Sequence, residues 1–175
     1  MKAPIKKELM KCFDAELEAR WPQFAVFDSE QDAKTWSWKA SPNLMFFVTV
    51  QALEGKEQFV IEVSWNEIAE FPWGAMGKVK AESSQGRERL GRLWESGPSE
   101  PVWDVLPEKT ARQVQDLDSI RQGKGIPSDP PFAQIQPRVM PLVRDAIDKF
   151  EKYGVPLFRR VAEAHGITSL AKGRD

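Results

Sequence analysis

The sequence has very few of the side chains that most often carry metal or nucleophilic chemistry. Its 175 residues include one cysteine, Cys12, and one histidine, His165. A single cysteine cannot form an intrachain disulfide, which fits a reducing compartment. Zinc sites normally use three or four Cys, His or carboxylate ligands, so a site built on soft ligands is nearly excluded. We therefore expect no cofactor, no metal and a cytoplasmic location.

Long apolar runs and a strong net charge are also missing. The longest apolar stretch, residues 44–50, is interrupted by Thr49 and is far shorter than the roughly 18 to 20 residues of a membrane-spanning helix. The N-terminus lacks the uninterrupted apolar core of an export signal. A formal net charge of -1 provides no overall field that would attract nucleic acid or an anionic membrane. We therefore expect a protein that is not bound to membranes.

Aromatic residues are abundant, with 10 phenylalanines and seven tryptophans. Within residues 24–66 they alternate with polar residues, and the breaks between these runs are only a few residues long. Short connections permit antiparallel pairing and exclude the helical crossover that parallel neighbours need. The pattern predicts an antiparallel meander of about four to five strands. We place Glu62 on its outward, solvated face, and expect these residues to face inward: Trp36, Trp38, Leu44, Phe46, Val48, Val50, Ala52, Phe59, Ile61, Val63 and Trp65.

Helical spacing appears at both ends of the sequence. Residues 4–20 carry an apolar stripe and begin with Pro4, which suits a first helical turn. A second stripe ends at Phe150, can begin at Pro137 or Pro141, and is followed by Gly154, which we expect to end it. A last helix is expected over residues 155–165. With a composition of 41% hydrophobic and 29% charged residues, these elements predict one α+β domain over residues 1–175, its helices packed on one face of the sheet.

The middle of the chain is less regular. Residues 85–94 (QGRERLGRLW) are expected to form a short helix, and residues 101–106 an edge strand in which the proline is tolerated. Residues 108–122 show three-residue apolar spacing, which predicts a helix. Residues 123–132 are expected to form a loop. We find no repeat or linker that would divide the chain.

The shortage of catalytic side chains favours a protein-binding module, of the immunity or antitoxin type, over an enzyme. Tryptophan and arginine most often anchor protein interfaces, and both gather where the periodicity fails. The candidate partner-binding residues are Trp73, Lys78, Lys80, Arg87, Arg89, Arg92, Trp94 and Trp103. The partner is expected to be another protein. We assign no catalytic residue, because Cys12 lies on an apolar stripe as a buried structural thiol and His165 is interpreted as a solvated helix end.

Two alternatives stay open. The first is a hydrolase-like enzyme that uses carboxylates such as Glu67 and Glu70, with Glu62 as a further candidate ligand for a hard metal. The second is a nucleic-acid binder, because basic residues between Lys78 and Arg92 could make phosphate contacts while flanking tryptophans stack on bases. Acidic residues interrupt this segment, so an ordinary solvated face or an acidic protein partner is the preferred interpretation.

The order of an N-terminal helix, an aromatic meander and two C-terminal helices, together with residues 147–158 (IDKFEKYGVPLF), resembles a bacterial family catalogued as domain of unknown function 4304. In that family a similar junction of glycine or alanine, an apolar residue, proline and a large apolar residue leads into the last short helix. The resemblance implies an α+β bacterial cytoplasmic protein. It implies no catalytic residue, and residues 67–129 depart from the family pattern.

Overall fold

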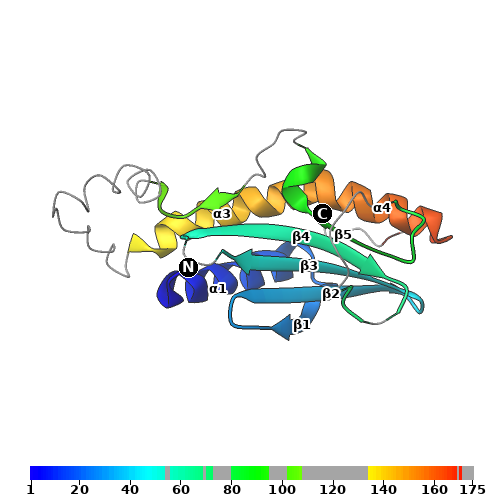
Figure 1. Cartoon of the computed structure of the whole chain (residues 1–175), viewed down its shortest axis with the longest axis horizontal. Coiled ribbons are helices and arrows are strands. Elements are labelled where there is room, and N and C mark those ends of the chain that lie inside the picture. Colours follow the sequence, from blue (N-terminus) through cyan, green and yellow to red (C-terminus); the bar gives the residue numbers. More distant parts are fainter. Residues whose placement is uncertain are drawn as a thin grey trace, which may run out of the picture.

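The computed structural model of the chain describes residues 1–53, 56–68, 70–72, 80–94, 102–107, 134–168 and 170. These residues form two layers, an antiparallel sheet and a set of helices that covers one of its faces (Figure 1). The predicted α+β class is confirmed. Among the helices of the described part, none has the length and apolarity needed to cross a membrane.

The first four strands form the predicted meander, and a fifth joins its far edge. Their order in the sheet is their order in the chain: β1 (Ala25–Ser29), β2 (Ala33–Ser41), β3 (Leu44–Ala52), β4 (Gln58–Asn66) and β5 (Gln85–Arg89). A two-residue strand, β6 (Trp103–Asp104), pairs with the start of β4, whereas β5 pairs with residues 62–66. Two short strands therefore share one edge of β4, and the edge strand predicted within residues 101–106 is confirmed.

The helix predicted over residues 85–94 is wrong for its first half. Residues 85–89 form β5, and only η1 (Leu90–Leu93) makes a helical turn, of the 3₁₀ type. Gly86 pairs with Trp65, and a Cβ atom at Gly86 would collide with the indole ring. Glycine is unfavourable in a helix interior but allows this close approach in a strand. Pairing along β4 therefore overrides a weak helical spacing.

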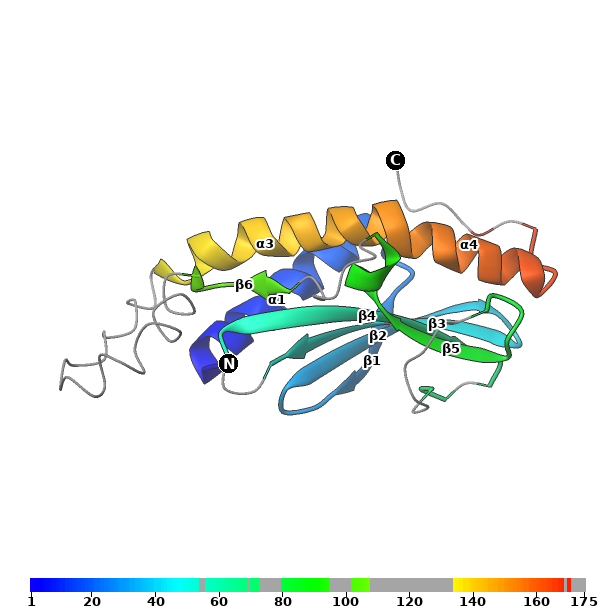
Figure 2. The same cartoon turned by 45° about the horizontal axis from the view of Figure 1, so that its top comes forward.

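Three helices lie on the same face of the sheet, as Figure 2 shows. The first, α1 (Ala3–Arg20), has Pro4 in its first turn and ends at Trp21, which confirms the predicted N-terminal helix. The second, α3 (Gln136–Lys149), has Pro137 in its first turn and Pro141 inside it. The third, α4 (Val155–Ala164), is closed by Gly166 in the left-handed region, at φ 75°.

Gly154 does not end a helix, so that prediction is wrong. A π turn, η3 (Phe150–Gly154), joins α3 to α4 in one continuous rod (Figure 2). Within it the Val155 N–H bonds to the Phe150 carbonyl, five residues back. The wider turn accommodates Pro156, which lacks an N–H and whose ring would crowd the carbonyl of Lys152 in a regular helix. A Cβ on Gly154 would lie 2.6 Å from the Phe150 ring, so this glycine serves close packing.

The core between sheet and helices is aromatic, as predicted. Phe46 of β3 stacks on Phe158 of α4 with 4.3 Å between ring centroids, and Phe13 of α1 meets Phe59 of β4 edge to face at 5.8 Å. Each large ring removes about 150–250 Å² from water, so this layer supplies much of the stability. Four buried tryptophans still donate their indole N–H: Trp21 to Glu151, Trp36 to Asp14, Trp65 to the Ser83 carbonyl and Trp103 to Asp145.

Candidate functional site

A row of polar residues crosses the face of the sheet that the helices leave open. The pairing register places Asp28 opposite Thr35, Thr35 opposite Thr49, Thr49 opposite Glu62, and Glu62 opposite Arg89. Directly opposed residues of antiparallel strands lie on the same face of a sheet. One residue from each of β1 to β5 therefore contributes to a continuous line, which we call the polar row.

The centre of the polar row is buried although it lies on the open face. Thr35 and Thr49 are both buried, and their hydroxyl oxygens form a hydrogen bond of 2.9 Å. Beside them the Glu62 side chain is only 1% exposed. A buried polar group costs free energy unless it is paired, so such a row needs a structural or functional reason.

Glu62 is held by two arginines of β5. Its Oε2 atom accepts hydrogen bonds from Nε and Nη2 of Arg87, at 2.8 and 2.6 Å. The Nε atom of Arg89 lies 3.8 Å from Oε1, beyond hydrogen-bonding distance. Within the described residues no donor forms a hydrogen bond to Oε1. One oxygen of a buried carboxylate is therefore left with acceptor capacity.

The prediction that Glu62 lies on a solvated strand face is wrong. Its strand does point the side chain away from the helices, but every residue of β4 is buried. β5 places Arg87 beside the carboxylate, and the chain after β4 returns Phe71 to the same face, with the Arg87 guanidinium 5.4 Å from the Phe71 ring centre. The alternation of apolar and polar residues shows on which face of the sheet a side chain lies. It does not show which later segments of the chain cover that face.

Aromatic rings border the polar row on one side. The β1–β2 pairing is irregular between Val26 and Asp28, and this bulge lets Phe27 share the open face with Asp28. Phe27 meets Phe47 of β3 edge to face at 5.2 Å, and Phe47 meets Phe71 at 5.5 Å. The three rings form an aromatic wall in which Phe47 is buried and Phe27 is 40% exposed.

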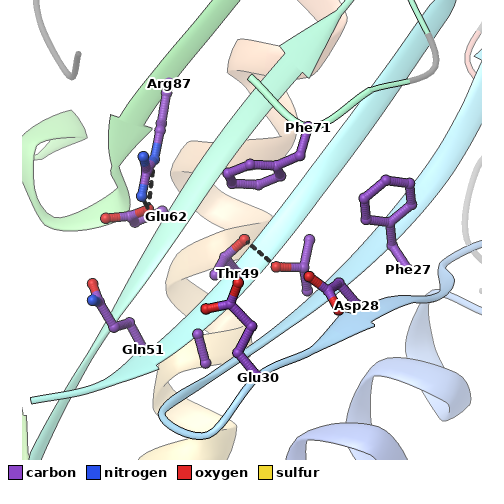
Figure 3. Close-up of a pocket in the computed structure, with 10 residues that line it drawn as sticks. Phe27, Asp28, Glu30, Thr49, Gln51, Glu62, Phe71 and Arg87 are labelled. Atoms are coloured by element: carbon purple, nitrogen blue, oxygen red, sulfur yellow. Dashed lines mark hydrogen bonds and ion pairs between the residues drawn. The ribbon is translucent and has the colours of Figure 1, made fainter. Parts of the chain in front are cut away.

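Between the wall and the polar row lies a hollow of about 130 Å³ (Figure 3). Its charged lining consists of three carboxylates and one guanidinium, so it is net acidic. The carboxylates come from Asp28 and Glu30 at the β1 side and from Glu62 of β4, and Figure 3 shows Arg87 above Glu62. The complete lining is Phe27, Asp28, Glu30, Ala33, Thr35, Thr49, Gln51, Glu62, Phe71 and Arg87.

The structure separates the basic residues that the sequence grouped as a partner-binding segment. Arg87 and Arg89 come together over Glu62 on the open face. Arg92 lies in η1, with Nη1 3.8 Å from Oε1 of Glu88. Lys80 is exposed in the loop before β5, and Lys78 lies outside the described residues.

The candidate tryptophans are not gathered on an open surface. Trp103 is buried and stacks on Phe59, with 5.4 Å between centroids. Trp94 is half-buried between Trp103 and Tyr153, at 6.1 and 5.2 Å, on the helical side of the sheet. Trp73 lies outside the described residues, as do the helix predicted over 108–122 and the loop over 123–132.

The carboxylates named for a hard metal do not converge. Oε1 of Glu67 lies 2.9 Å from Nδ1 of His165, and the other ring nitrogen lies 3.2 Å from the Ser83 carbonyl oxygen. The His165 side chain is only 13% exposed, so the prediction of a solvated helix end is wrong. Glu70 is exposed and Glu62 lies in the hollow. In the part of the chain that the structure describes, no three His, Cys, Asp or Glu side chains are grouped to hold a metal.

Cys12 is a buried thiol, as predicted. It lies on the buried face of α1, and its sulfur is 3.7 Å from Oε1 of Glu8. Burial, followed by the neighbouring Glu8 charge, raises the pKa of Cys12 to about 11. The thiolate is the reactive form, so this side chain is inert near neutral pH.

Eight of the ten lining residues were not candidates from the sequence, among them the polar residues Asp28, Glu30, Thr35 and Thr49. Alternation along the two strands marks Thr35 and Thr49 as outward residues. The turn at Pro42 and Asn43 puts Ser41 opposite Leu44, which alone would place Thr35 opposite Val50. An irregularity between Lys39 and Ser41 shifts the pairing by one residue and brings Thr35 opposite Thr49, so the turn did not reveal this pair.

On the opposite face of β5, Glu88 provides a pH-dependent test of the fold. Burial raises its pKa, partly offset by the Arg89 N–H and the charge of Arg92. The native state therefore keeps this proton to higher pH than the unfolded state, and stability falls as pH rises from the unfolded pKa through the raised folded pKa. A Glu88→Gln variant should gain stability relative to the wild type across this acidic window, which urea unfolding at a series of pH values would measure.

The control for this prediction is Glu82→Gln, a change at an exposed residue of the preceding loop. It should alter the free energy of unfolding by no more than about 0.5 kcal/mol at any pH. A stability difference between Glu88→Gln and wild type that stays constant from acidic to neutral pH would contradict the burial of a titrating carboxyl at this position.

Comparison with models of protein families, with curated proteins and with solved structures finds no match to this chain. A function must therefore be argued from the hollow and its surroundings.

Proposed function

We propose that this chain is a non-catalytic protein-binding module whose binding surface is the open face of the sheet around the hollow. The observation that carries the proposal is the size and position of this hollow. It measures about 130 Å³, whereas pockets for small molecules typically span roughly 300–1,000 Å³. A hollow of this size accommodates one side chain, and it opens on a broad face rather than in a closed cleft.

The surroundings of the hollow support the same proposal. Phenylalanine and arginine, which the aromatic wall and Arg87 bring together, are both enriched in protein interfaces. Next to it runs β1, an edge strand whose five residues are all exposed. Exposed strand edges offer unpaired backbone groups to a partner chain. We favour a binding module of the immunity or antitoxin type. A toxin gene next to the gene for this chain would support that type.

Nucleic acid is the less favoured ligand because the arginines already interact with carboxylates of the same chain. Arg87 and Arg89 face the Glu62 carboxylate, and Arg92 lies near Glu88. Phosphate binding needs cations that can replace released counterions. Such a function predicts binding that weakens steeply with salt.

A carboxylate-dependent enzyme is the second candidate, favoured by one observation. Asp28, Glu30 and Glu62 line the same hollow, and paired carboxylates are the usual means of acid–base catalysis. The volume of the hollow limits a substrate to a small terminal group. Turnover of a substrate that stops in a Glu62→Gln variant of unchanged stability would favour this candidate over the binding module.

Site-specific photo-crosslinking tests the binding module. A benzoylphenylalanine in place of Phe27 presents the crosslinker on the open face with little change in shape. The matched control carries it at Glu163, an exposed position of α4. In lysate of the source cell we expect the Phe27 probe to give one saturable protein adduct and the Glu163 probe to give none. Adducts from neither position, or the same adducts from both, would overturn the proposal.

A further inference from the structure

We propose that His165 forms a pH-sensitive latch, which ties the end of α4 to both ends of the connection between β4 and β5. The latch consists of the imidazole ring, the Glu67 carboxylate and the Ser83 carbonyl group. It is closed while both ring nitrogens have a proton. It loses one of its two hydrogen bonds as the pH rises through the ordinary titration range of histidine, between about pH 5 and 8. This device goes beyond the proposed function and does not depend on it.

The imidazole ring of His165 lies between two oxygen atoms. Oε1 of Glu67 is 2.9 Å from Nδ1, and the carbonyl oxygen of Ser83 is 3.2 Å from Nε2. An ionised carboxylate and a carbonyl group accept hydrogen bonds and donate none. A neutral imidazole has one N–H group and one bare nitrogen, so it can donate to only one of the two oxygens. The doubly protonated ring donates to both, and the geometry therefore fits the charged form.

The position of His165 in the fold also suits a positive charge. Its backbone N–H closes the last turn of α4, at 3.0 Å from the Val161 carbonyl oxygen and 3.1 Å from that of Ala162. The C-terminus of a helix has a partial negative charge, which stabilises a protonated histidine. The side chain is only 13% exposed, so the charged ring depends on its two protein acceptors more than on water.

The charged groups around the ring are mostly acidic. Among the described residues, Glu67 is the charged side chain that contacts the ring. Glu82, beside Ser83, and Glu163, in the last turn of α4, are exposed carboxylates that act in the same direction, while the exposed Lys80 opposes them. Exposed charges interact weakly through water. The contact with Glu67 therefore contributes most to the preference for the protonated ring.

The latch holds a segment whose two ends are already joined. The Glu67 N–H donates to the Ser84 carbonyl oxygen at 2.8 Å, and the Ser83 carbonyl oxygen also accepts the indole N–H of Trp65 at 3.0 Å. The same connection places Phe71 on the open face, where its ring belongs to the aromatic wall. A proton on one side chain of the helical layer therefore acts on a segment that borders the hollow.

NMR of the imidazole group tests the latch directly, because His165 is the only histidine in the 175 residues. The N–H protons of a solvated imidazole exchange with water too fast to be observed. In the intact chain we expect two imidazole N–H signals at about pH 5.5, both protected by their hydrogen bonds, and one at about pH 8. Fewer than two signals at the lower pH, or two that persist at the higher pH, would overturn the proposal.

Hydrogen exchange measures what the latch contributes to the connection. The probe is the backbone amide of residue 67, which bonds to Ser84, and its exchange rate is divided by the rate of an unstructured peptide at the same pH. We expect this protection to fall about tenfold between about pH 5.5 and 8, the factor expected when one charge-assisted hydrogen bond is lost. Protection that does not change with pH would contradict the latch.

Two variants assign this fall in protection to the latch. Glu67→Gln removes the carboxylate from a side chain that is 46% exposed, and its amide group can pair with a neutral ring, so the fall should disappear. His165→Gln removes the titrating ring and should have the same effect. The matched control, Glu82→Gln, makes the same charge change as Glu67→Gln at the exposed neighbour of Ser83 and should keep the tenfold fall.

The N-terminal amine titrates near the same range, but it bonds to the Leu53 carbonyl before the start of β4, whereas Glu67 follows the end of that strand. A fall in protection that persists in Glu67→Gln or in His165→Gln would assign the pH dependence to another group and overturn the proposal. The same holds if Glu82→Gln abolishes the fall, because the effect would then come from the overall charge of this region.

Discussion

Replacing Arg87 with methionine should destabilise the fold by about 3 kcal/mol, because it leaves the buried carboxylate of Glu62 without its two short hydrogen bonds. The Glu62 side chain is 1% exposed, so its carboxylate depends on protein donors rather than on bulk water. Arg89 stays 3.8 Å from Oε1 and compensates only in part. Urea unfolding, read as the shift in midpoint at constant slope, measures the loss.

Two further variants establish that the cost comes from burial. Arg144→Met removes an ion pair of similar length, 2.9 Å to Glu16, but its arginine is 64% exposed, so the expected loss is at most about 1 kcal/mol. The double variant Glu62→Leu with Arg87→Met should recover stability, since replacing both members of a buried pair is often nearly neutral. Equal effects of Arg87→Met and Arg144→Met, or a double variant no better than Arg87→Met, would contradict the account.

Phe46→Ala should cost about 4 kcal/mol, because it opens a cavity in the middle of the aromatic core. Phe46 is fully buried, stacks on Phe158 of α4 and lies 5.7 Å from Trp38. The loss combines the transfer of a large ring with the removal of a stacking partner from the helical layer. Thermal and urea unfolding should both report it, together with a weaker near-ultraviolet circular dichroism signal.

The matched control is Phe27→Ala, the same substitution on the other face of the sheet. Phe27 is 40% exposed and touches Phe47 at the rim of the hollow, so about 1 kcal/mol is expected from its partial burial. Phe46→Leu should retain most of the stability because it keeps much of the volume. If Phe27→Ala costs as much as Phe46→Ala, the core does not lie between the sheet and the helices as described.

The elements with a clear period could be predicted from the sequence. The α1 stripe, the four-strand meander and the aromatic face toward the helices follow from spacing alone, because burial of one face imposes the period of the element. Strand β5 could not be predicted, since five residues containing two arginines and a glycine have no apolar alternation to reveal them. Its place is decided by pairing with β4 and by the fit of Gly86 against Trp65.

The candidate site was less predictable than the fold. The sequence drew attention to Arg87 and Arg89 as surface cations, and the structure shows them bound to Glu62. The polar row depends on the register of five strands. That register includes a bulge in β1 that no glycine, proline or other turn residue indicates in the sequence. Gly154 was also misinterpreted from its local sequence. Glycine followed by proline suggests a helix end, yet a π turn accommodates both residues and the helix continues. Short sequence patterns indicate which local structures a segment favours, and contacts with distant parts of the chain determine which of these it adopts.

The single rod formed by α3, η3 and α4 has a consequence for the order in which the protein acquires its structure during translation. The meander, residues 25–66, leaves the ribosome long before residues 136–164, which cover its aromatic face. Until then α1 is the only one of the three helices available to cover Phe46, Phe59 and Trp65. We expect the emerging polypeptide to be a client of ribosome-associated chaperones.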